Sequence, residues 1–283
     1  MDTQRSNRWL YDEEASNVNS QCGEDGIVSA ILSLLGDETN GWCVEFGAHD
    51  GEHFSNTFNL SQNCGYNAVL IEGDQERCEA TRRRFAESTG VHVIEGYVGF
   101  DRHDNLDCVL EQTPIPAEYD FLSIDIDGND YHAWEATSAY RPKIVCIEYN
   151  PTIPTELHYV QPKNPACQHG SSIAALVRLG REKGYELVSI TPLNCLFVQH
   201  SLFSRFGIGE NSPIVLRPEG APLTHLFFTY DGECVIQGFG KSPWHRIPLK
   251  QSRIQPVPWF LRTYPGKYTA FQRFLLRWFT RHK

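Results

Sequence analysis

Short apolar runs alternate with amphipathic or charged stretches between about residues 20 and 200. Most of these runs end at a glycine, a proline or an acid, which is typical of strands buried inside a sheet. We predict strands at 42–46, 68–71, 91–98, 119–125, 143–148, 185–190 and 195–198. Apolar spacing of three and four residues, or dense charge on a solvated face, predicts helices at 27–35, 75–87, 101–111, 131–140 and 171–183.

Strands that alternate with helices predict an α/β fold, because parallel neighbours need a crossover connection. We therefore expect a doubly wound, mostly parallel, Rossmann-like sheet with helices on both faces. The last two predicted strands are joined by a Thr-Pro-Leu-Asn segment, residues 191–194, so they should form a hairpin. That hairpin predicts an antiparallel strand that closes the sheet.

The pattern is weaker at both ends of the chain and in one internal loop. Residues 1–20 are polar and are expected to be irregular, whereas residues 152–169 form a long polar loop. Loops of that length are usually functional or disordered. Because the pattern fades after about residue 204, we predict a domain over 1–204 and an extension over 205–283.

Composition narrows the choice of function. The 283 residues are 41% hydrophobic, which suits a globular core, and a net charge of −10 argues against a nucleic-acid partner. The nine cysteines include no pair two or three residues apart, so zinc-ribbon motifs are excluded. An odd number favours a reducing compartment, and the first residues lack the apolar core of a signal peptide. We therefore expect a cytoplasmic protein without a membrane span.

The stretch 41–51, Gly-Trp-Cys-Val-Glu-Phe-Gly-Ala-His-Asp-Gly, is the most informative part of the sequence. A short strand breaks there into a turn that contains Gly47 and Gly51, and Glu45 lies just before it. Such a strand, turn and helix can bind a nucleotide, although the Gly-x-Gly-x-x-Gly fingerprint is absent. Glu72 ends the next strand, where an acid can accept hydrogen bonds from a ribose. The alternative is an ordinary connection between a strand and a helix.

Four motifs together resemble one family. They are Ser-Gln-Cys-Gly-Glu-Asp-Gly at 20–26, Val-Glu-Phe-Gly-Ala-His-Asp-Gly at 44–51, Leu-Ile-Glu-Gly at 70–73 and Ser-Ile-Asp-Ile-Asp-Gly at 123–128. In this order they resemble the FkbM-type S-adenosylmethionine-dependent methyltransferases, which have the class I methyltransferase fold and include O-methyltransferases of natural products and sugars. The resemblance covers about residues 20–200 and implies O-methylation of a small hydroxylated substrate.

The resemblance also implies roles for individual residues. Glu45, Gly47 and Gly51 would line the methionine part of the S-adenosylmethionine cofactor, and Glu72 would hold its ribose hydroxyls. Residues 97–100 would flank the adenine. Asp125 would face the methyl group and belong to both the catalytic and the cofactor-binding residues.

Acids at two strand ends suggest a metal site. Asp125 and Glu148 close neighbouring predicted strands, so both should lie at the carboxyl edge of the sheet, with Asp127 and Asn150 beside them. Oxygen ligands of this kind suit Mg²⁺, which could orient and acidify a substrate hydroxyl. For Asp127 and for Asp130, turn formation and helix capping around a glycine are an equal alternative.

Histidines supply candidates for a general base, because O-methylation requires removal of the hydroxyl proton. His49 lies on the glycine turn and His132 begins a predicted helix; His53 and His158 are further candidates. Each is more often a structural histidine. Two other functions compete with the methyltransferase: a binding or scaffold protein that keeps the fold without catalysis, and a nicotinamide-dependent enzyme, which the missing fingerprint disfavours.

The C-terminal residues 262–283 reverse the charge of the chain. They contain six arginines and lysines and no acid, and aromatic residues recur at three- and four-residue steps. We predict an amphipathic helix that docks on its own domain or on a second subunit, with the arginines in solvent. The alternative is a helix that lies on an anionic membrane surface.

Overall fold

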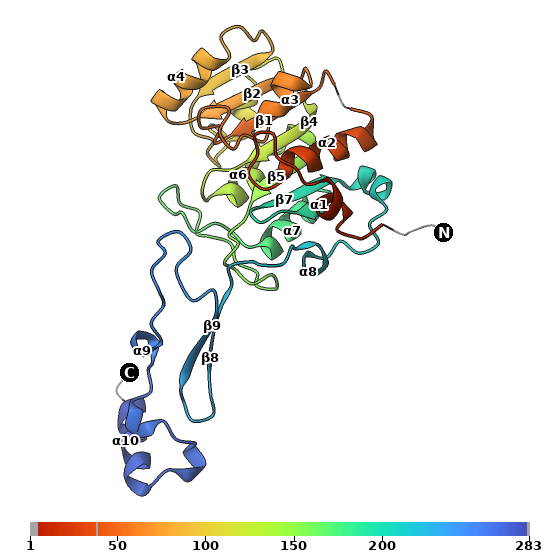
Figure 1. Ribbon diagram of the computed structural model, residues 1–283. Helices are drawn as coiled ribbons and strands as arrows, with labels where there is room; N and C mark the ends of the chain where they lie inside the picture. The colour runs from red at the N-terminus through yellow and green to blue at the C-terminus, as the bar shows by residue number, and fades with distance from the viewer. Residues whose placement is uncertain (1–4, 38, 282–283) are drawn as a thin grey trace. The chain divides into compact units, whose positions relative to one another are not determined.

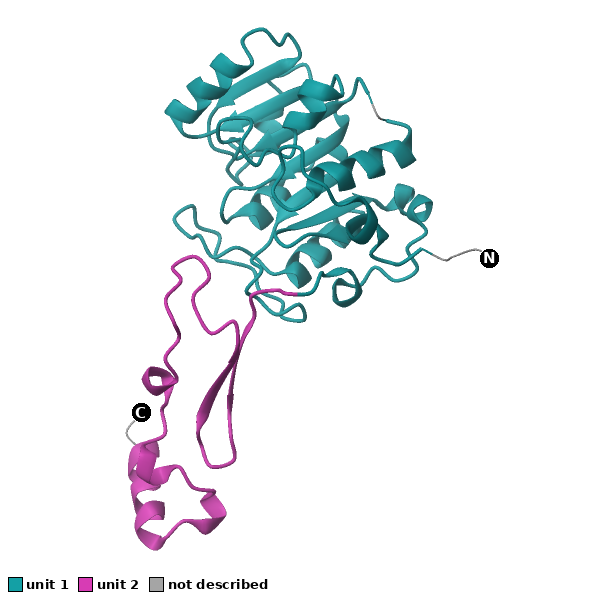
Figure 2. Cartoon of the chain, in the orientation of Figure 1, with its two compact units in different colours: residues 1–219 teal, residues 220–283 magenta. Residues whose placement is uncertain are grey.

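The computed structural model describes residues 5–37 and 39–281, which form two compact units, 1–219 and 220–283 (Figure 2). The two units are described separately below. The last two residues of the predicted basic segment, His282 and Lys283, lie outside the described residues, and so does the side chain of Arg281.

A seven-stranded sheet forms the centre of the first unit, with the order β3-β2-β1-β4-β5-β7-β6 (Figure 1). Neighbouring strands are parallel except that β7 runs antiparallel to both β5 and β6. The strands are β1 (Trp42–Phe46), β2 (Asn67–Glu72), β3 (Val91–Glu95), β4 (Glu118–Ile124), β5 (Arg141–Glu148), β6 (Tyr185–Ile190) and β7 (Asn194–Gln199). This arrangement is the class I methyltransferase fold, and it confirms the predicted doubly wound sheet with its closing antiparallel strand.

Helices cover both faces of the sheet, as predicted, and each face has its own apolar core. One core packs α5 (Leu106–Leu110), α6 (Asp130–Ala136) and α7 (Ile173–Glu182) against the strands. The other packs α1 (Trp9–Glu14), α2 (Glu24–Leu35) and α3 (Phe58–Asn63). Alternate residues of one strand enter opposite cores, which explains why the strands appear in the sequence as continuous apolar runs.

Three local expectations were wrong. Residues 1–20 contain helix α1, because Trp9 and Leu10 are buried and the Trp9 indole donates to the carbonyl of Phe206 at 3.1 Å. Strand β3 ends at Glu95 rather than at residue 98. The predicted helix 101–111 shortens to α5, because the preceding residues form a turn in which the Gly99 amide donates to the carbonyl of Asp104.

The first unit extends beyond residue 204 to Glu219. This added segment contains the 3₁₀ helix η1 (His200–Phe206) and α8 (Pro213–Leu216). Arg217 is buried at its end, and its guanidinium donates to the carbonyls of Pro151 and Ile153 at 2.7 and 3.2 Å. These bonds attach the segment to the loop that follows β5. Helix α4 (Gln75–Arg84) completes the unit between β2 and β3.

The second unit contains a β-hairpin and short helices. The hairpin pairs β8 (Thr224–Phe228) with β9 (Cys234–Gly238), and the sequence pattern gave no sign of it. The helices are α9 (Gln251–Ile254), η2 (Trp259–Leu261), η3 (Pro265–Lys267) and α10 (Ala270–Arg281), of which α10 confirms the expected terminal helix. Within the described parts of the chain, none of the helices has the length and apolarity needed to cross a membrane.

Candidate functional site

The glycine turn after β1 crosses the end of β4 in close contact. Gly47 has a φ of +81°, and a Cβ at this position would lie 1.7 Å from the carbonyl oxygen of Asp125. The amides of Gly47 and Ala48 both donate to the carbonyl of Ile71, at 3.1 and 3.2 Å. Glycine is therefore required at residue 47 by its backbone angle and by its neighbours. At Gly51 the atoms nearest to a Cβ would instead belong to the side chains of Phe85 and Thr81.

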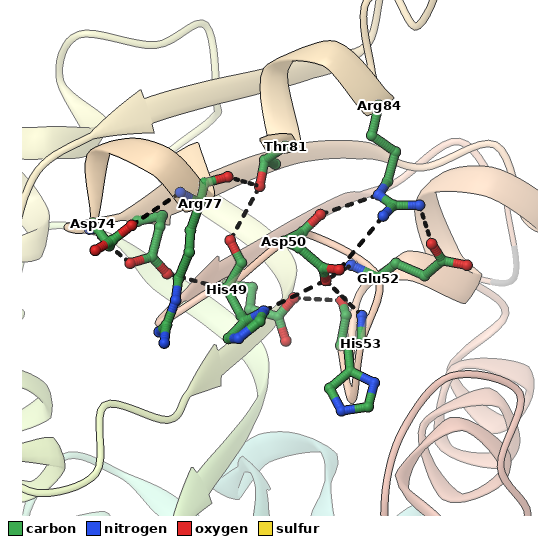
Figure 3. Close-up of polar contacts among 11 residues, drawn as sticks. His49, Asp50, Glu52, His53, Asp74, Arg77, Thr81 and Arg84 are labelled. Carbon is green, nitrogen blue, oxygen red and sulfur yellow. Dashed lines mark hydrogen bonds and ion pairs between the residues drawn. The ribbon is translucent and has the colours of Figure 1, made fainter. Parts of the chain in front are cut away.

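Glu72, the acid at the end of β2, joins two loops at this edge of the sheet. Its carboxylate accepts the amide of His49 at 2.7 Å and the amide of Asp74 at 2.8 Å. Thr81 of α4 adds a hydrogen bond to the carbonyl of His49 at 3.1 Å, and Figure 3 shows this contact. A carboxylate has about four lone-pair sites, so these two bonds do not use its full capacity as an acceptor.

Asp50, which the sequence reasoning left without a role, organises the tip of the glycine turn. Its side chain accepts the amides of Glu52 and His53 at 3.1 and 2.8 Å, and Arg84 reaches its carboxylate and its carbonyl oxygen (Figure 3). Partial burial acts to raise the pKa of Asp50, but the His53 amide and the Arg84 guanidinium together lower it. The imidazole of His49 lies 3.6 Å from Asp50 and is about half exposed. The turn is thus fixed while the imidazole of His49 stays accessible.

Glu45 has an internal role in the structure. Its buried carboxylate accepts the hydroxyls of Ser55 and Thr57 at 2.5 and 2.7 Å and the amide of Asn56 at 2.8 Å. Burial raises the pKa of Glu45, and these hydrogen bonds oppose the increase. The carboxylate therefore holds the segment that leads into α3, and its contact with a cofactor stays a prediction.

Asp125, Asp127 and Glu148 meet at the carboxyl ends of β4 and β5. One oxygen of each lies within 4.8 Å of the others, which is close enough for a single cation to contact all three. Asp130 lies behind them and accepts the amides of Ile126 and Gly128, both at 3.0 Å. These bonds confirm the turn-forming alternative for Asp130. The structure thus brings together three of the four residues that we predicted to bind a metal.

Two carboxyl groups of this cluster, those of Asp125 and Glu148, have raised pKa values. Desolvation is the largest cause, and repulsion from the neighbouring acids adds to it. Together they raise the pKa of Glu148 to about 10 and that of Asp125 to about 7. Asp125 is exposed to solvent at this edge of the sheet. Glu148 therefore holds its proton at neutral pH unless a cation balances the charge.

The side chain of Asn150 makes hydrogen bonds to the loop that follows β5. Its amide nitrogen donates to the carbonyl of His169 at 2.7 Å, and its amide oxygen accepts both the amide and the hydroxyl of Thr152, at 2.9 and 2.6 Å. The strand ends at Glu148, and Asn150 instead orders the start of the long loop. Both polar groups of this side chain thus already have partners, and its role as the fourth metal ligand stays a prediction.

His132, the second predicted base, is buried and holds the long loop. Its Nε2 lies 2.9 Å from the carbonyl of Gln161, and its Nδ1 lies 3.7 Å from a carboxylate oxygen of Glu135. Asn129 adds hydrogen bonds to the carbonyls of Asn164 and Cys167, both at 3.1 Å. The 152–169 loop is therefore attached to the start of α6, beside the carboxylates. Sequence reasoning identified the loop but not these attachments.

The two aromatic residues of the segment 97–100, which we predicted to flank an adenine, have different neighbours. The Tyr97 ring is 81% exposed and lies against Gly73, where a Cβ would come within 2.2 Å of it. Phe100 instead packs edge-on against His132, with ring centroids 5.9 Å apart. Tyr97 is thus the aromatic residue of this segment that lies beside the end of β2.

No protein-family model and no curated protein matches this chain, so the resemblance to the FkbM-type family stays a prediction. Several solved structures align with part of it. A S-adenosylmethionine-dependent methyltransferase from Aquifex aeolicus is 12% identical, with 60% of this chain and 87% of that chain covered and a TM-score of 0.39. The trans-methyltransferase CalH, in complex with S-adenosylhomocysteine, is 15% identical, with coverage of 61% and 55% and a TM-score of 0.41. The mitomycin 7-O-methyltransferase MmcR is 12% identical, with coverage of 62% and 54% and a TM-score of 0.34. At these identities and TM-scores the likeness supports no conclusion about the function of this chain.

Proposed function

We propose that this protein is a S-adenosylmethionine-dependent methyltransferase that methylates a hydroxyl group of a small molecule, such as a sugar or a natural product. The observation that carries the proposal is the group of three carboxylates, Asp125, Asp127 and Glu148, at the carboxyl edge of a sheet with the class I methyltransferase strand order. Ligands of open α/β sheets bind at this edge, so the cluster would lie beside a bound cofactor.

The cofactor part of the proposal is supported by the loops around Glu72. Residue 47 is a glycine without a Cβ, so a ligand can approach the backbone of the glycine turn closely. The carboxylate of Glu72 has further acceptor sites for ribose hydroxyls. Tyr97 lies next to Gly73 at the same strand end, where it can contact an adenine face.

The carboxylates can supply two things that O-methylation needs, namely ligands for a cation and a base for the hydroxyl proton. Three carboxylate oxygens within contact of one point are hard ligands, which suit Mg²⁺. Such a cation, when bound, would lower the pKa of a substrate hydroxyl. S-adenosylmethionine, when bound, would supply the methyl group, and an oxygen of Asp125 that the cation leaves free would accept the proton of the substrate hydroxyl.

The histidines are ranked by their surroundings. His132 is held by the carbonyl of Gln161 and is therefore a positioning residue for the loop in this proposal. His49 keeps an accessible ring on the glycine turn and is the second candidate for the base.

The test is methyl transfer from methyl-labelled S-adenosylmethionine to a panel of monosaccharides, catechols and phenols, with Mg²⁺ or with EDTA. We expect labelled product only with the cation, and Asp125→Asn should abolish it. Glu118→Gln is the matched control, because Glu118 is exposed at the opposite end of the same strand. Full activity in EDTA would exclude the cation and favour His49 as the base. Tight cofactor binding with no transfer to any acceptor would instead favour the non-catalytic alternative.

A further inference from the structure

The second unit, residues 220–283, carries most of the exposed apolar side chains of the protein. Among the described residues, the large hydrophobic side chains that are exposed in the first unit number six, and they are scattered along the chain. The much shorter second unit has sixteen: Leu226, Phe227, Phe228, Tyr230, Phe239, Trp244, Ile247, Leu249, Ile254, Trp259, Tyr264, Phe271, Phe274, Leu276, Trp278 and Phe279. Exposed apolar surface concentrated in this way indicates an interaction site.

The charge of the same unit is opposite to that of the rest of the chain. Residues 220–283 contain ten arginines and lysines and only two acids, Asp231 and Glu233, which gives a net charge of +8. Since the whole chain carries −10, residues 1–219 carry −18. Any partner of the second unit must therefore offer both an apolar layer and negative charge.

Helix α10 combines the two properties on adjacent faces. At 3.6 residues per turn, Phe271, Phe274 and Trp278 fall on one side of the helix, and Arg273 and Arg277 fall beside them. Phe271 and Phe274 are 67% and 65% exposed.

A different side of α10 attaches the helix to its own unit. Gln272 donates to the carbonyl of Phe260 at 3.0 Å, and the Phe279 ring lies 6.3 Å from that of Phe260. Trp259, the neighbour of Phe260 in η2, is 80% exposed. The expected docking of the apolar face on the helix's own unit is therefore only partial, because the aromatic side stays in solvent.

We propose that α10, together with η2, binds the surface of an anionic membrane. Aromatic side chains bordered by arginines are the pattern of a helix that lies in the lipid interface, where rings enter the acyl boundary and guanidinium groups stay with the headgroups. Lipid supplies both the apolar layer and the negative charge that this unit requires.

Two protein surfaces fit less well as the occupant. The first unit of a second copy is acidic, but its few exposed hydrophobic side chains are too scattered to cover the aromatic side of α10. The second unit of a second copy has apolar surface, but it carries the same charge of +8 and would be repelled. This proposal concerns location and does not depend on the methyltransferase activity.

The test is co-sedimentation of the full-length protein with vesicles of phosphatidylcholine alone or mixed with phosphatidylserine. We expect binding to the anionic vesicles, and this binding should weaken as salt is raised. The paired change Arg273→Gln and Arg277→Gln should weaken it about 30-fold, since each arginine near an anionic surface contributes about 1 kcal/mol. Phe271→Ser with Phe274→Ser should weaken it about tenfold or more.

The matched control changes two exposed arginines of the first unit, Arg83→Gln and Arg181→Gln, which should leave vesicle binding unchanged. Sedimentation velocity on every variant reports folding and assembly. Absence of binding by the parent protein, or equal binding to both vesicle types, would overturn the proposal. So would a result in which Phe271→Ser with Phe274→Ser changes the assembly state but not vesicle binding, because a second copy would then be the occupant.

Discussion

Replacement of Glu148 by glutamine should stabilise the metal-free protein at alkaline pH. The half-buried carboxyl group of Glu148 has a pKa of about 10, against an ordinary value of 4.5, because burial and the neighbouring acids disfavour its charged form. Between these two pH values, the native state keeps a proton that the unfolded chain has released. The contribution of Glu148 to the free energy of unfolding is therefore largest below pH 4.5 and falls as the pH rises.

The size of this effect follows from the proton linkage. Each pH unit in this range removes about 1.4 kcal/mol per group, so three units, from about pH 5 to about pH 8, remove about 4 kcal/mol at most. Asp125 is left out of this figure because its side chain reaches solvent. Glutamine keeps the shape of the neutral acid and does not ionise. The variant should consequently lose less stability over this pH range than the parent protein.

The assay is urea denaturation in EDTA at both pH values, repeated with Mg²⁺. We expect Mg²⁺ to stabilise the parent protein at the higher pH, by about 2.7 kcal/mol at a hundredfold excess over its dissociation constant, and to have a smaller effect on Glu148→Gln. Glu118→Gln, at the opposite edge of the sheet, should match the parent in every condition. Equal dependence on pH in the parent and in Glu148→Gln would refute the reasoning, because the carboxylates would then not be perturbed by one another.

Three further predictions concern the fold around the site. Gly47→Ala should prevent folding or lower the thermal midpoint sharply, since its Cβ would lie 1.7 Å from a carbonyl oxygen at the end of β4; a normal melting curve would contradict this. Glu45→Ala should reduce the free energy of unfolding by about 3 kcal/mol or more, measured with urea, because three buried donors lose their acceptor. A fragment of residues 1–219 should fold by circular dichroism, whereas residues 1–204 should not, because the shorter fragment lacks the buried Arg217.

The sheet could be predicted from the sequence because its strands are buried on both faces. Such strands leave uninterrupted apolar runs that stop at turn residues, and the order of strands and helices then restricts the topology. Helix α1 left no comparable signal, since its burial depends on only two residues, Trp9 and Leu10. The hairpin of the second unit was also missed, because Leu226, Phe227 and Phe228 are consecutive, exposed and do not alternate.

Part of the candidate site could also be predicted, because it follows from the positions of the strand ends. Acids at strand ends must meet at one edge of a parallel sheet, so the grouping of Asp125 with Glu148 follows from the strand assignments. The positions of Asn150 and His132 do not follow, because each is set by hydrogen bonds to a loop distant in the sequence. Contacts of this kind depend on the path of the loop, which has no apolar periodicity to reveal it.

Calorimetric titration with S-adenosylhomocysteine and NADH, side by side, tests the central claim most directly. We predict micromolar affinity for S-adenosylhomocysteine and no heat with NADH. Glu72→Ala should weaken the binding by about 10- to 150-fold, as expected for a lost charge-assisted hydrogen bond. Glu95→Ala is the control, because Glu95 pairs in register with Glu72 at the end of the neighbouring strand and should not affect binding. Binding of NADH without S-adenosylhomocysteine, or unchanged affinity in Glu72→Ala, would contradict the proposed cofactor site.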